Sequence, residues 1–175
     1  MSAARILLER IRREGTISGE VIKVDRFLNH MVDPELIRVL GNDLAGRFAD
    51  RSATKVLTAE TSGIMLAQAV ALALQVPFVY AKKKRPITMT DYFSAASYSF
   101  TKQESTTLYV SREVLGNQDR VIFVDDFFAT GATLNAIEEI VRQAGAALVG
   151  SAVIINKSDR RDIEAILTLD DLVAG

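Results

Sequence analysis

The feature that most constrains this fold is the stretch over residues 121–133, VIFVDDFFATGAT. Its opening apolar run predicts a buried parallel strand, because strands covered on both faces read as continuous apolar segments. Asp125 and Asp126 close the strand, a turn of small residues follows, and residues 134–144 have helical apolar spacing. Ligands of open α/β sheets bind where strand carboxyl ends meet helix amino ends. The stretch therefore predicts a ligand site.

The small-residue turn offers groups that suit a phosphate. Backbone N–H groups and two hydroxyls would lie at the positive end of the helix dipole. These groups belong to Ala129, Thr130, Gly131, Ala132 and Thr133. The two preceding carboxylates can hold sugar hydroxyls or a hydrated magnesium ion. A plainer alternative is a buried strand ending in solvated carboxylates, with a threonine capping the helix. The whole pattern favours a sugar-phosphate site.

Composition excludes several kinds of chemistry. The chain has 175 residues, 49% of them hydrophobic, so we expect one domain over residues 1–175 with a core that needs no metal or disulfide. There is no cysteine, and His30 is the only histidine. These counts exclude thiolate metal sites, Ser-His-Asp triads and multi-histidine zinc sites.

Charge and hydropathy indicate where the protein works. The formal net charge is -1, so no basic field points to nucleic acid. No apolar run is long enough to span a membrane, and residues 1–20 lack a signal-peptide core. We expect a soluble, cytoplasmic protein without a membrane or nucleic-acid partner.

Apolar runs alternate with helical spacing, which predicts an α/β fold with a Rossmann-like parallel sheet flanked by helices. Asp33 and Pro34 have the residue types of a helix N-cap and first position. The helix over residues 64–74 is apolar almost all round and is expected to be buried. A polar excursion over residues 82–102 contains the start of an expected hairpin arm over residues 98–110. The expected helices cover residues 3–14, 34–49, 64–74 and 134–144; the expected strands cover residues 20–27, 55–58, 77–81, 120–124, 147–155 and 163–167; residues 170–175 are expected to be a tail.

A second strand-to-helix turn lies on the same predicted sheet edge. It comprises Glu60, Thr61, Ser62 and Gly63, and it could present backbone donors to an anion, although such residues are also ordinary in turns. The next strand ends in a basic run over residues 82–85, which is either a solvated loop or a source of positive charge for a ligand.

The stretch over residues 121–133 resembles the signature of the type I phosphoribosyltransferases, which bind phosphoribosyl pyrophosphate at this turn. The resemblance implies that catalytic Asp125 and Asp126 hold the ribose hydroxyls and that residues 129–133 hold the 5′-phosphate. It implies that magnesium binds mainly through the substrate and that the arm over residues 88–102 closes over the site. It assigns the pyrophosphate to Thr61, Ser62, Gly63, Lys82 and Lys84, with Lys82 preferred because it leaves the strand directly.

Three further segments resemble the xanthine phosphoribosyltransferases, which are homodimeric bacterial salvage enzymes. They are residues 22–34, 99–103 and 156–158. The resemblance implies purine contacts from the backbone near Ile22, the side chain of Asn29 and the cation of Lys157, and a small hood built from both termini. The connection after Lys157 and the tail beyond Asp171 are shorter than in those enzymes.

The expected reaction joins xanthine, or alternatively guanine or hypoxanthine, to the phosphoribosyl group and releases pyrophosphate. Two alternatives stay open. One is an adenine phosphoribosyltransferase. The other is a non-catalytic regulator that keeps the phosphoribosyl pyrophosphate site.

Overall fold

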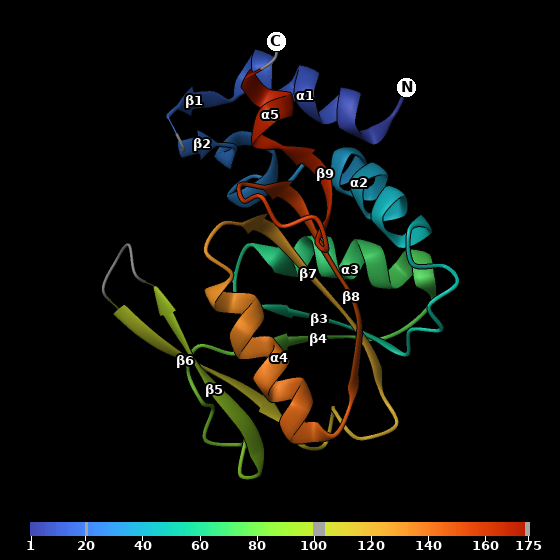
Figure 1. Cartoon of the computed structure of the whole chain (residues 1–175), viewed down its shortest axis with the longest axis vertical. Coiled ribbons are helices and arrows are strands. Elements are labelled where there is room, and N and C mark those ends of the chain that lie inside the picture. The colour runs from blue at the N-terminus through green and yellow to red at the C-terminus, as the bar shows by residue number, and fades with distance from the viewer. Residues whose placement is uncertain (20, 100–103, 174–175) are drawn as a thin grey trace.

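The centre of the molecule is a five-stranded parallel sheet with strand order β4-β3-β7-β8-β9 (Figure 1). The computed structural model describes residues 1–19, 21–99 and 104–173. The sheet strands are β3 (Lys55–Ala59), β4 (Phe78–Ala81), β7 (Arg120–Phe128), β8 (Ala147–Asn156) and β9 (Glu164–Thr168). The predicted α/β fold is confirmed. Strand β7 runs four residues beyond the predicted end at Val124, because Asp125, Phe127 and Phe128 continue the pairing with β8.

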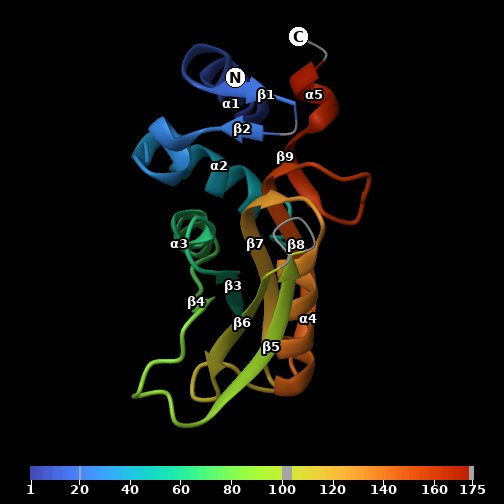
Figure 2. The same cartoon turned by 90° about the vertical axis from the view of Figure 1, so that its left-hand side faces the viewer.

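Helices cover both faces of this sheet. The helices are α1 (Ala3–Glu14), α2 (Pro34–Gly46), α3 (Gly63–Leu74), α4 (Ala132–Ala144) and α5 (Leu169–Val173). Helices α2 and α3 lie on one face and α4 on the other (Figure 2). The side chains of β7 alternate between the two, since Ile122 and Val124 pack in the core with α2 and α3, while Val121 and Phe123 pack with α4. This double burial explains the continuous apolar run in the sequence.

The outer side of α3 differs from the expectation of full burial. Met65 is 39% exposed and Leu72 is 71% exposed. Both line an apolar hollow of about 690 Å³ between α2 and α3. The helix is apolar all round because one side faces the sheet and another faces this hollow.

The predicted arm is a two-stranded hairpin of β5 (Tyr92–Ser99) and β6 (Glu104–Ser111). It begins earlier than residue 98, and its first strand packs along α4, where Gln143 Nε2 donates to the Ser94 carbonyl at 2.9 Å. Backbone hydrogen bonds between Lys82 and Tyr109, both 2.9 Å, join the hairpin to the end of β4. Residues 100–103 of the segment that resembles the xanthine enzymes lie outside the described residues.

Segments from both ends of the chain gather at one end of the molecule (Figures 1 and 2). The N-terminal part contains α1, a small hairpin of β1 (Thr16–Ser18) and β2 (Val21–Lys23), and a π-helix over Asp25–Asn29. The expectation of an extended segment over residues 20–27 was wrong beyond Lys23, because the π-helix buries Phe27 and Leu28 side by side. The expected tail contains helix α5, which Leu172 anchors by burial.

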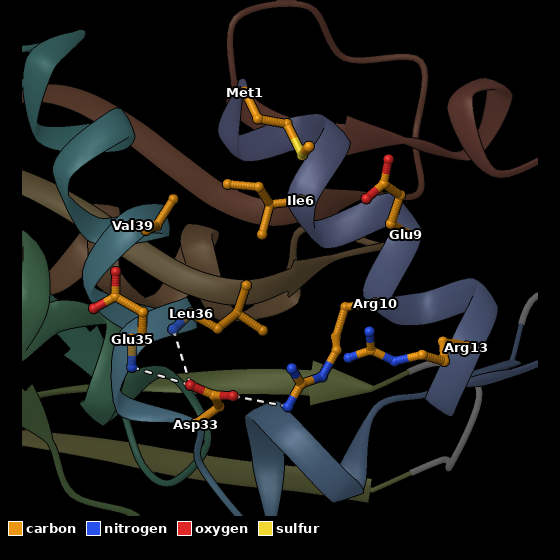
Figure 3. A pocket seen from close by; sticks show the side chains of 9 residues that line it. All are labelled: Met1, Ile6, Glu9, Arg10, Arg13, Asp33, Glu35, Leu36 and Val39. Atoms are coloured by element: carbon orange, nitrogen blue, oxygen red, sulfur yellow. Dashed lines mark hydrogen bonds and ion pairs between the residues drawn. The ribbon is translucent and has the colours of Figure 1, made fainter.

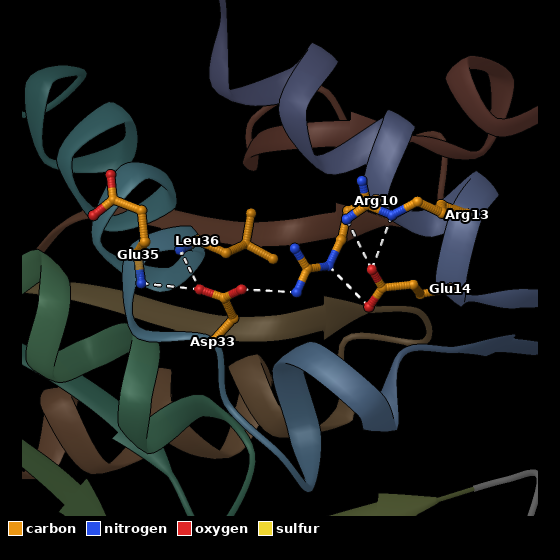
Figure 4. Close-up of polar contacts among 6 residues, drawn as sticks. All are labelled: Arg10, Arg13, Glu14, Asp33, Glu35 and Leu36. Atoms are coloured by element: carbon orange, nitrogen blue, oxygen red, sulfur yellow. Dashed lines mark hydrogen bonds and ion pairs between the residues drawn. The ribbon is translucent and has the colours of Figure 1, made fainter.

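An ion-pair network attaches α1 to the start of α2. Arg10 Nη2 donates to Asp33 Oδ2 at 2.7 Å, and both side chains are about three-quarters buried (Figures 3 and 4). Asp33 Oδ1 accepts from the N–H groups of Glu35 and Leu36, so Asp33 is the predicted N-cap. A hollow of about 300 Å³ lies beside this pair, between α1 and α2 (Figure 3). One carboxylate therefore caps a helix and holds a second helix in place.

The network has a second carboxylate, Glu14, at the end of α1. Glu14 Oε2 lies 3.0 Å from Arg10 Nε, and Glu14 Oε1 accepts from Arg13 Nη2 at 2.8 Å (Figure 4). The Arg10 guanidinium also lies 5.7 Å from the ring centroid of Phe27. Arg10 thus joins α1 to the π-helix as well as to α2.

We expect Asp33→Ala to destabilise the fold by roughly 1 kcal/mol or more, because it removes the N-cap and the partner of Arg10. Asp33→Asn can still cap the helix and should cost less. The hydrogen bond from the Leu36 N–H, aided by the charge of Arg10, holds the pKa of Asp33 below its ordinary value. The contribution of its charge is therefore fully present above about pH 3.8 and is lost as the pH falls below that value.

Urea unfolding of the wild type and both variants, from pH 7 stepwise to pH 3, measures this effect. The gap between the wild type and Asp33→Asn should narrow as the pH falls. Asp50→Asn, on a side chain that is 87% exposed, is the control. A gap that stays constant down to pH 3 would contradict the assigned role of the charge.

Candidate active site

The candidate site lies where the sheet order reverses. Strand β3 is followed along the chain by β4 on one side, whereas β7 is followed by β8 on the other. Such a switch point leaves a crevice at the carboxyl ends of the two central strands. The turns after β3 and β7 therefore meet, as the sequence predicted. A cavity of about 430 Å³ lies there, and its lining includes Glu60, Ser62, Asp125, Asp126 and Thr133.

The paired carboxylates differ in their surroundings although they are adjacent in sequence. Asp125 Oδ1 accepts from the Asp126 N–H, and Asp126 Oδ1 accepts from the Phe127 N–H, both at 2.9 Å. Burial, together with the charge of Asp126, raises the pKa of Asp125 well above its ordinary value, while Lys83 opposes this rise. The carboxyl group of Asp125 therefore holds its proton more readily than an exposed aspartate, and a cationic group in the cavity would favour its ionised form.

Helix α3 begins against Asp125 through a close approach that requires glycine. A Cβ on Gly63 would lie 2.3 Å from Thr58 Oγ1 and 2.7 Å from Asp125 Oδ1. Thr58 Oγ1 is buried and has no hydrogen-bond partner among the described residues. The amino end of α3 and Ser62 thus border the carboxylate cavity, although Thr61 is exposed and lines neither cavity of the site. The peptide bond between Glu60 and Thr61 is cis.

The turn after β7 encloses a second, adjoining cavity of about 200 Å³. Its lining shares Ser97, Asp125, Phe127 and Thr133 with the first cavity. All the predicted phosphate-loop residues line it: Ala129, Thr130, Gly131, Ala132 and Thr133. Gly131 has a positive φ of 80° and precedes the first residue of α4, so the loop turns into the helix through a conformation that favours glycine. The amino end of α4 therefore faces a hollow of phosphate size.

The basic residues after β4 are placed differently from one another. Lys83 lines the carboxylate cavity, whereas Lys82 and Lys84 do not. Lys82 Nζ lies 4.7 Å from the ring centroid of Tyr80, and Lys84 is exposed. The role of Glu60 is also visible, because its Oε2 accepts from the Lys83 N–H at 2.8 Å. Sequence reasoning missed Lys83, for which the only signal was membership of the basic run.

The three residues expected to contact a base line neither cavity. Lys157 is connected to the cavities through Phe127. Its Nζ lies 4.6 Å from the ring centroid of Phe127, which borders both cavities. Ile22 is buried in β2, and Asn29 ends the π-helix of the N-terminal segment. The Oδ1 atom of Asn29 is buried without a partner among the described residues. Asn29 thus holds a buried acceptor that no described residue satisfies.

The donor set fits a hydrated magnesium ion better than a fully protein-coordinated metal. No group of three or more histidine, cysteine, aspartate or glutamate side chains among the described residues could hold a metal. The cavity does contain carboxylates from Asp125 and Asp126, which are the hard oxygen ligands that Mg²⁺ accepts directly or through water.

No helix in the described part of the chain has the length and apolar character of a membrane span.

We expect Gly63→Ala to lower the melting temperature, because the new methyl group must displace Thr58 or Asp125 from positions under 3 Å away. Gly46→Ala is a matched control, since a Cβ there meets nothing within 4 Å. Thermal unfolding followed by circular dichroism compares the two. Equal melting temperatures for both variants would contradict the close packing of Gly63.

Comparison with known proteins agrees with this geometry. Residues 34–166 match the family described as the phosphoribosyl transferase domain. Two curated relatives are named xanthine phosphoribosyltransferase. The protein from Brevibacillus brevis is 51% identical over 87% of this chain and 79% of its own length. The protein from Heliobacterium modesticaldum is 48% identical over 89% of this chain and 83% of its own length.

A solved structure shares the fold. The adenine phosphoribosyltransferase from Thermoanaerobacter pseudethanolicus superimposes with a TM-score of 0.75 at 20% identity, covering 92% of this chain and 99% of that one. At that identity the likeness concerns the fold alone. The family match extends over most of the chain and includes both turns that build the cavities. This chain belongs to the phosphoribosyltransferase family.

Proposed function

We propose that this protein transfers the phosphoribosyl group from phosphoribosyl pyrophosphate to xanthine, releasing pyrophosphate. The observation that carries the proposal is the meeting of two strand-to-helix turns around Asp125 and Asp126, with a phosphate-sized hollow on one side. The curated relatives at 51 and 48% identity, both named for xanthine, support the choice of base. Guanine and hypoxanthine are the neighbouring choices, because they share an oxo group at the same ring position.

The carboxylate pair would hold the ribose. Its hydroxyls can donate to Asp125 and Asp126, and the negative field of the pair stabilises positive charge that develops on the sugar as the bond to pyrophosphate breaks. The loop over residues 129–133 would hold the 5′-phosphate at the amino end of α4. Sheet strands and helix ends would thus position the donor, and a fixed geometry of the reacting groups lowers the entropic part of the activation barrier.

The pyrophosphate would lie at the amino end of α3, near the basic run. Thr61, Ser62 and Gly63 form the turn that leads into the helix. We assign the nearest positive charge to Lys83, which lines the cavity and whose backbone Glu60 fixes. Lys82 and Lys84 remain candidates that would reach the pyrophosphate when the basic segment moves over it. The hairpin of β5 and β6 would shield the bond that breaks from water.

The base would lie between the cavity and the N-terminal segment. Lys157 favours an oxo-substituted purine over adenine, because its ammonium group only donates hydrogen bonds. Asn29 offers the unsatisfied acceptor described above, and the backbone near Ile22 would supply a further contact. Magnesium, bound mainly through the pyrophosphate, would neutralise charge on the leaving group.

We also propose that the chain acts as one domain and as a cytoplasmic homodimer, without nucleic-acid or membrane partners. The apolar hollow between α2 and α3, with the exposed side chains of Met65 and Leu72, offers a surface for the second copy. Sedimentation equilibrium would measure the mass, and charged substitutions of both residues should favour the monomer.

Pyrophosphate release tests the proposed reaction. The protein is incubated with magnesium, phosphoribosyl pyrophosphate and xanthine, guanine, hypoxanthine or adenine, each in turn. We expect the highest kcat/KM with xanthine. Preference for adenine would overturn the roles of Asn29 and Lys157. Binding of phosphoribosyl pyrophosphate without turnover on any base would favour a regulator instead of an enzyme.

The double variant Asp125→Asn with Asp126→Asn should lower turnover by at least about 100-fold, because it removes the charge that faces the developing positive sugar. Its fold should survive, since asparagine keeps the shape of each side chain. The matched control carries Asp50→Asn and Asp91→Asn, on side chains that are 87 and 75% exposed. Wild-type rates in the first double variant would make the carboxylate pair merely structural.

A further inference from the structure

The end of strand β8 contains a buried asparagine whose amide oxygen and amide nitrogen both have hydrogen-bond partners. Asn156 is 3% exposed. Its Oδ1 accepts from the N–H and the hydroxyl of Ser158, both at 2.9 Å, and its Nδ2 donates to the carbonyl of Arg160 at 2.8 Å. A buried amide without partners would be costly, so these contacts fix the chain that follows the strand.

Lys157 is the central residue of this turn. Asparagine side chains that accept from the N–H two residues later form a compact turn around the residue between them. Lys157 is also held by its backbone, whose N–H donates to the Phe128 carbonyl at 2.7 Å. Asn156 itself is paired with Phe128 of β7 and with Thr168 of β9. The direction in which Lys157 leaves the sheet is therefore fixed by the bond to Phe128 and by the turn that Asn156 forms with Ser158.

The same contacts close the short connection between β8 and β9. The Arg160 N–H donates to Ser158 Oγ at 3.2 Å, so the serine hydroxyl links Asn156 to Arg160. The Arg160 guanidinium pairs with Asp162 and lies 5.5 Å from the ring centroid of Phe128, in the strand that carries the carboxylates. A connection this short is held against the active-site strand by a few side chains, and Asn156 is the buried one.

The position of Lys157 matters because of what it touches. Its ammonium lies 4.6 Å from the ring centroid of Phe127, which borders both cavities. A cation held over an aromatic face next to the donor cavity is placed to meet the edge of a base above the ribose. The side-chain hydrogen bonds of Asn156 go to Ser158 and Arg160, which belong neither to the carboxylate pair nor to the phosphate loop.

We infer that Asn156 is a positioning residue for base recognition, which acts by holding Lys157 through the turn over Asn156, Ser158 and Arg160. The inference rests on the proposed function and extends it to a residue without contact to the cavities. Asparagine suits the position because it supplies a donor and an acceptor on one short side chain. Aspartate would lose the donor and turn a charge toward the Arg160 carbonyl.

Steady-state kinetics with xanthine separate positioning from general damage. We expect Asn156→Ala to raise the KM for xanthine about tenfold, which corresponds to about 1.4 kcal/mol. The KM for phosphoribosyl pyrophosphate should change less than about twofold, since the donor site depends on other turns. Ser158→Ala, which keeps the N–H donor and a half-buried side chain, should give a smaller rise in the same constant. The Ser158→Ala variant replaces Asn156→Ala in this test if Asn156→Ala fails to fold. Asn117→Ala, on an exposed loop, is the control.

A double-mutant cycle with Lys157→Ala tests the route of the effect. If Asn156 acts through Lys157, its substitution should change the KM for xanthine less than about twofold once Lys157 is already alanine. Additive effects would overturn the inference, as would a wild-type KM for xanthine in both Asn156→Ala and Ser158→Ala. An equal rise in both substrate constants would also overturn it. A wild-type protein inactive on every purine would instead refute the proposed function.

Discussion

The site depends on the parallel pairing of β7 between β3 and β8. This pairing places Asp125 and Asp126 at the switch point of the sheet. There the connection after β3 leads to one side of the sheet, and the connection after β7 leads to the other. The two helices that follow, α3 and α4, then begin beside the same cavities from opposite faces of the sheet. Two positive helix ends thus border one pair of carboxylates. A ligand with phosphate at both ends and a sugar between them matches this order of charge.

The same pairing explains why part of the site was predictable. A strand buried on both faces must be apolar throughout, so residues 121–124 were recognisable without any partner. The turn over residues 129–133 and the cap at Asp33 were predictable because local backbone geometry selects their residue types. Asp125 and Asp126 concealed the continuation of β7, since carboxylates ordinarily mark the end of a strand. Only the pairing with β8 shows that the strand continues.

The remaining features depend on contacts between distant segments, which a single sequence does not record. Lys83, rather than Lys82, lines the cavity because Lys82 is paired through its backbone with Tyr109 of the arm, and Glu60 then binds the next N–H. The π-helix over Asp25–Asn29 was missed because residues 20–27 were interpreted as one extended segment, although Val24, Phe27 and Leu28 have helical spacing. Its shape depends on burying Phe27 near Arg10 of another helix.

Pairing within the sheet and contacts between distant segments stabilise different parts of the candidate site. The proposed donor half lies at strand and helix ends, where backbone groups and the carboxylates of Asp125 and Asp126 take their positions from the sheet. The proposed base half is held by side-chain contacts, namely Arg10 with Asp33 on one side and Asn156 with Ser158 on the other. Substitution in such a bridge can shift Asn29 or Lys157 while the sheet stays in place. In the proposed reaction, substitutions in loops and bridges can therefore change the choice of base, whereas the donor site depends on the sheet and on the side chains at its strand ends.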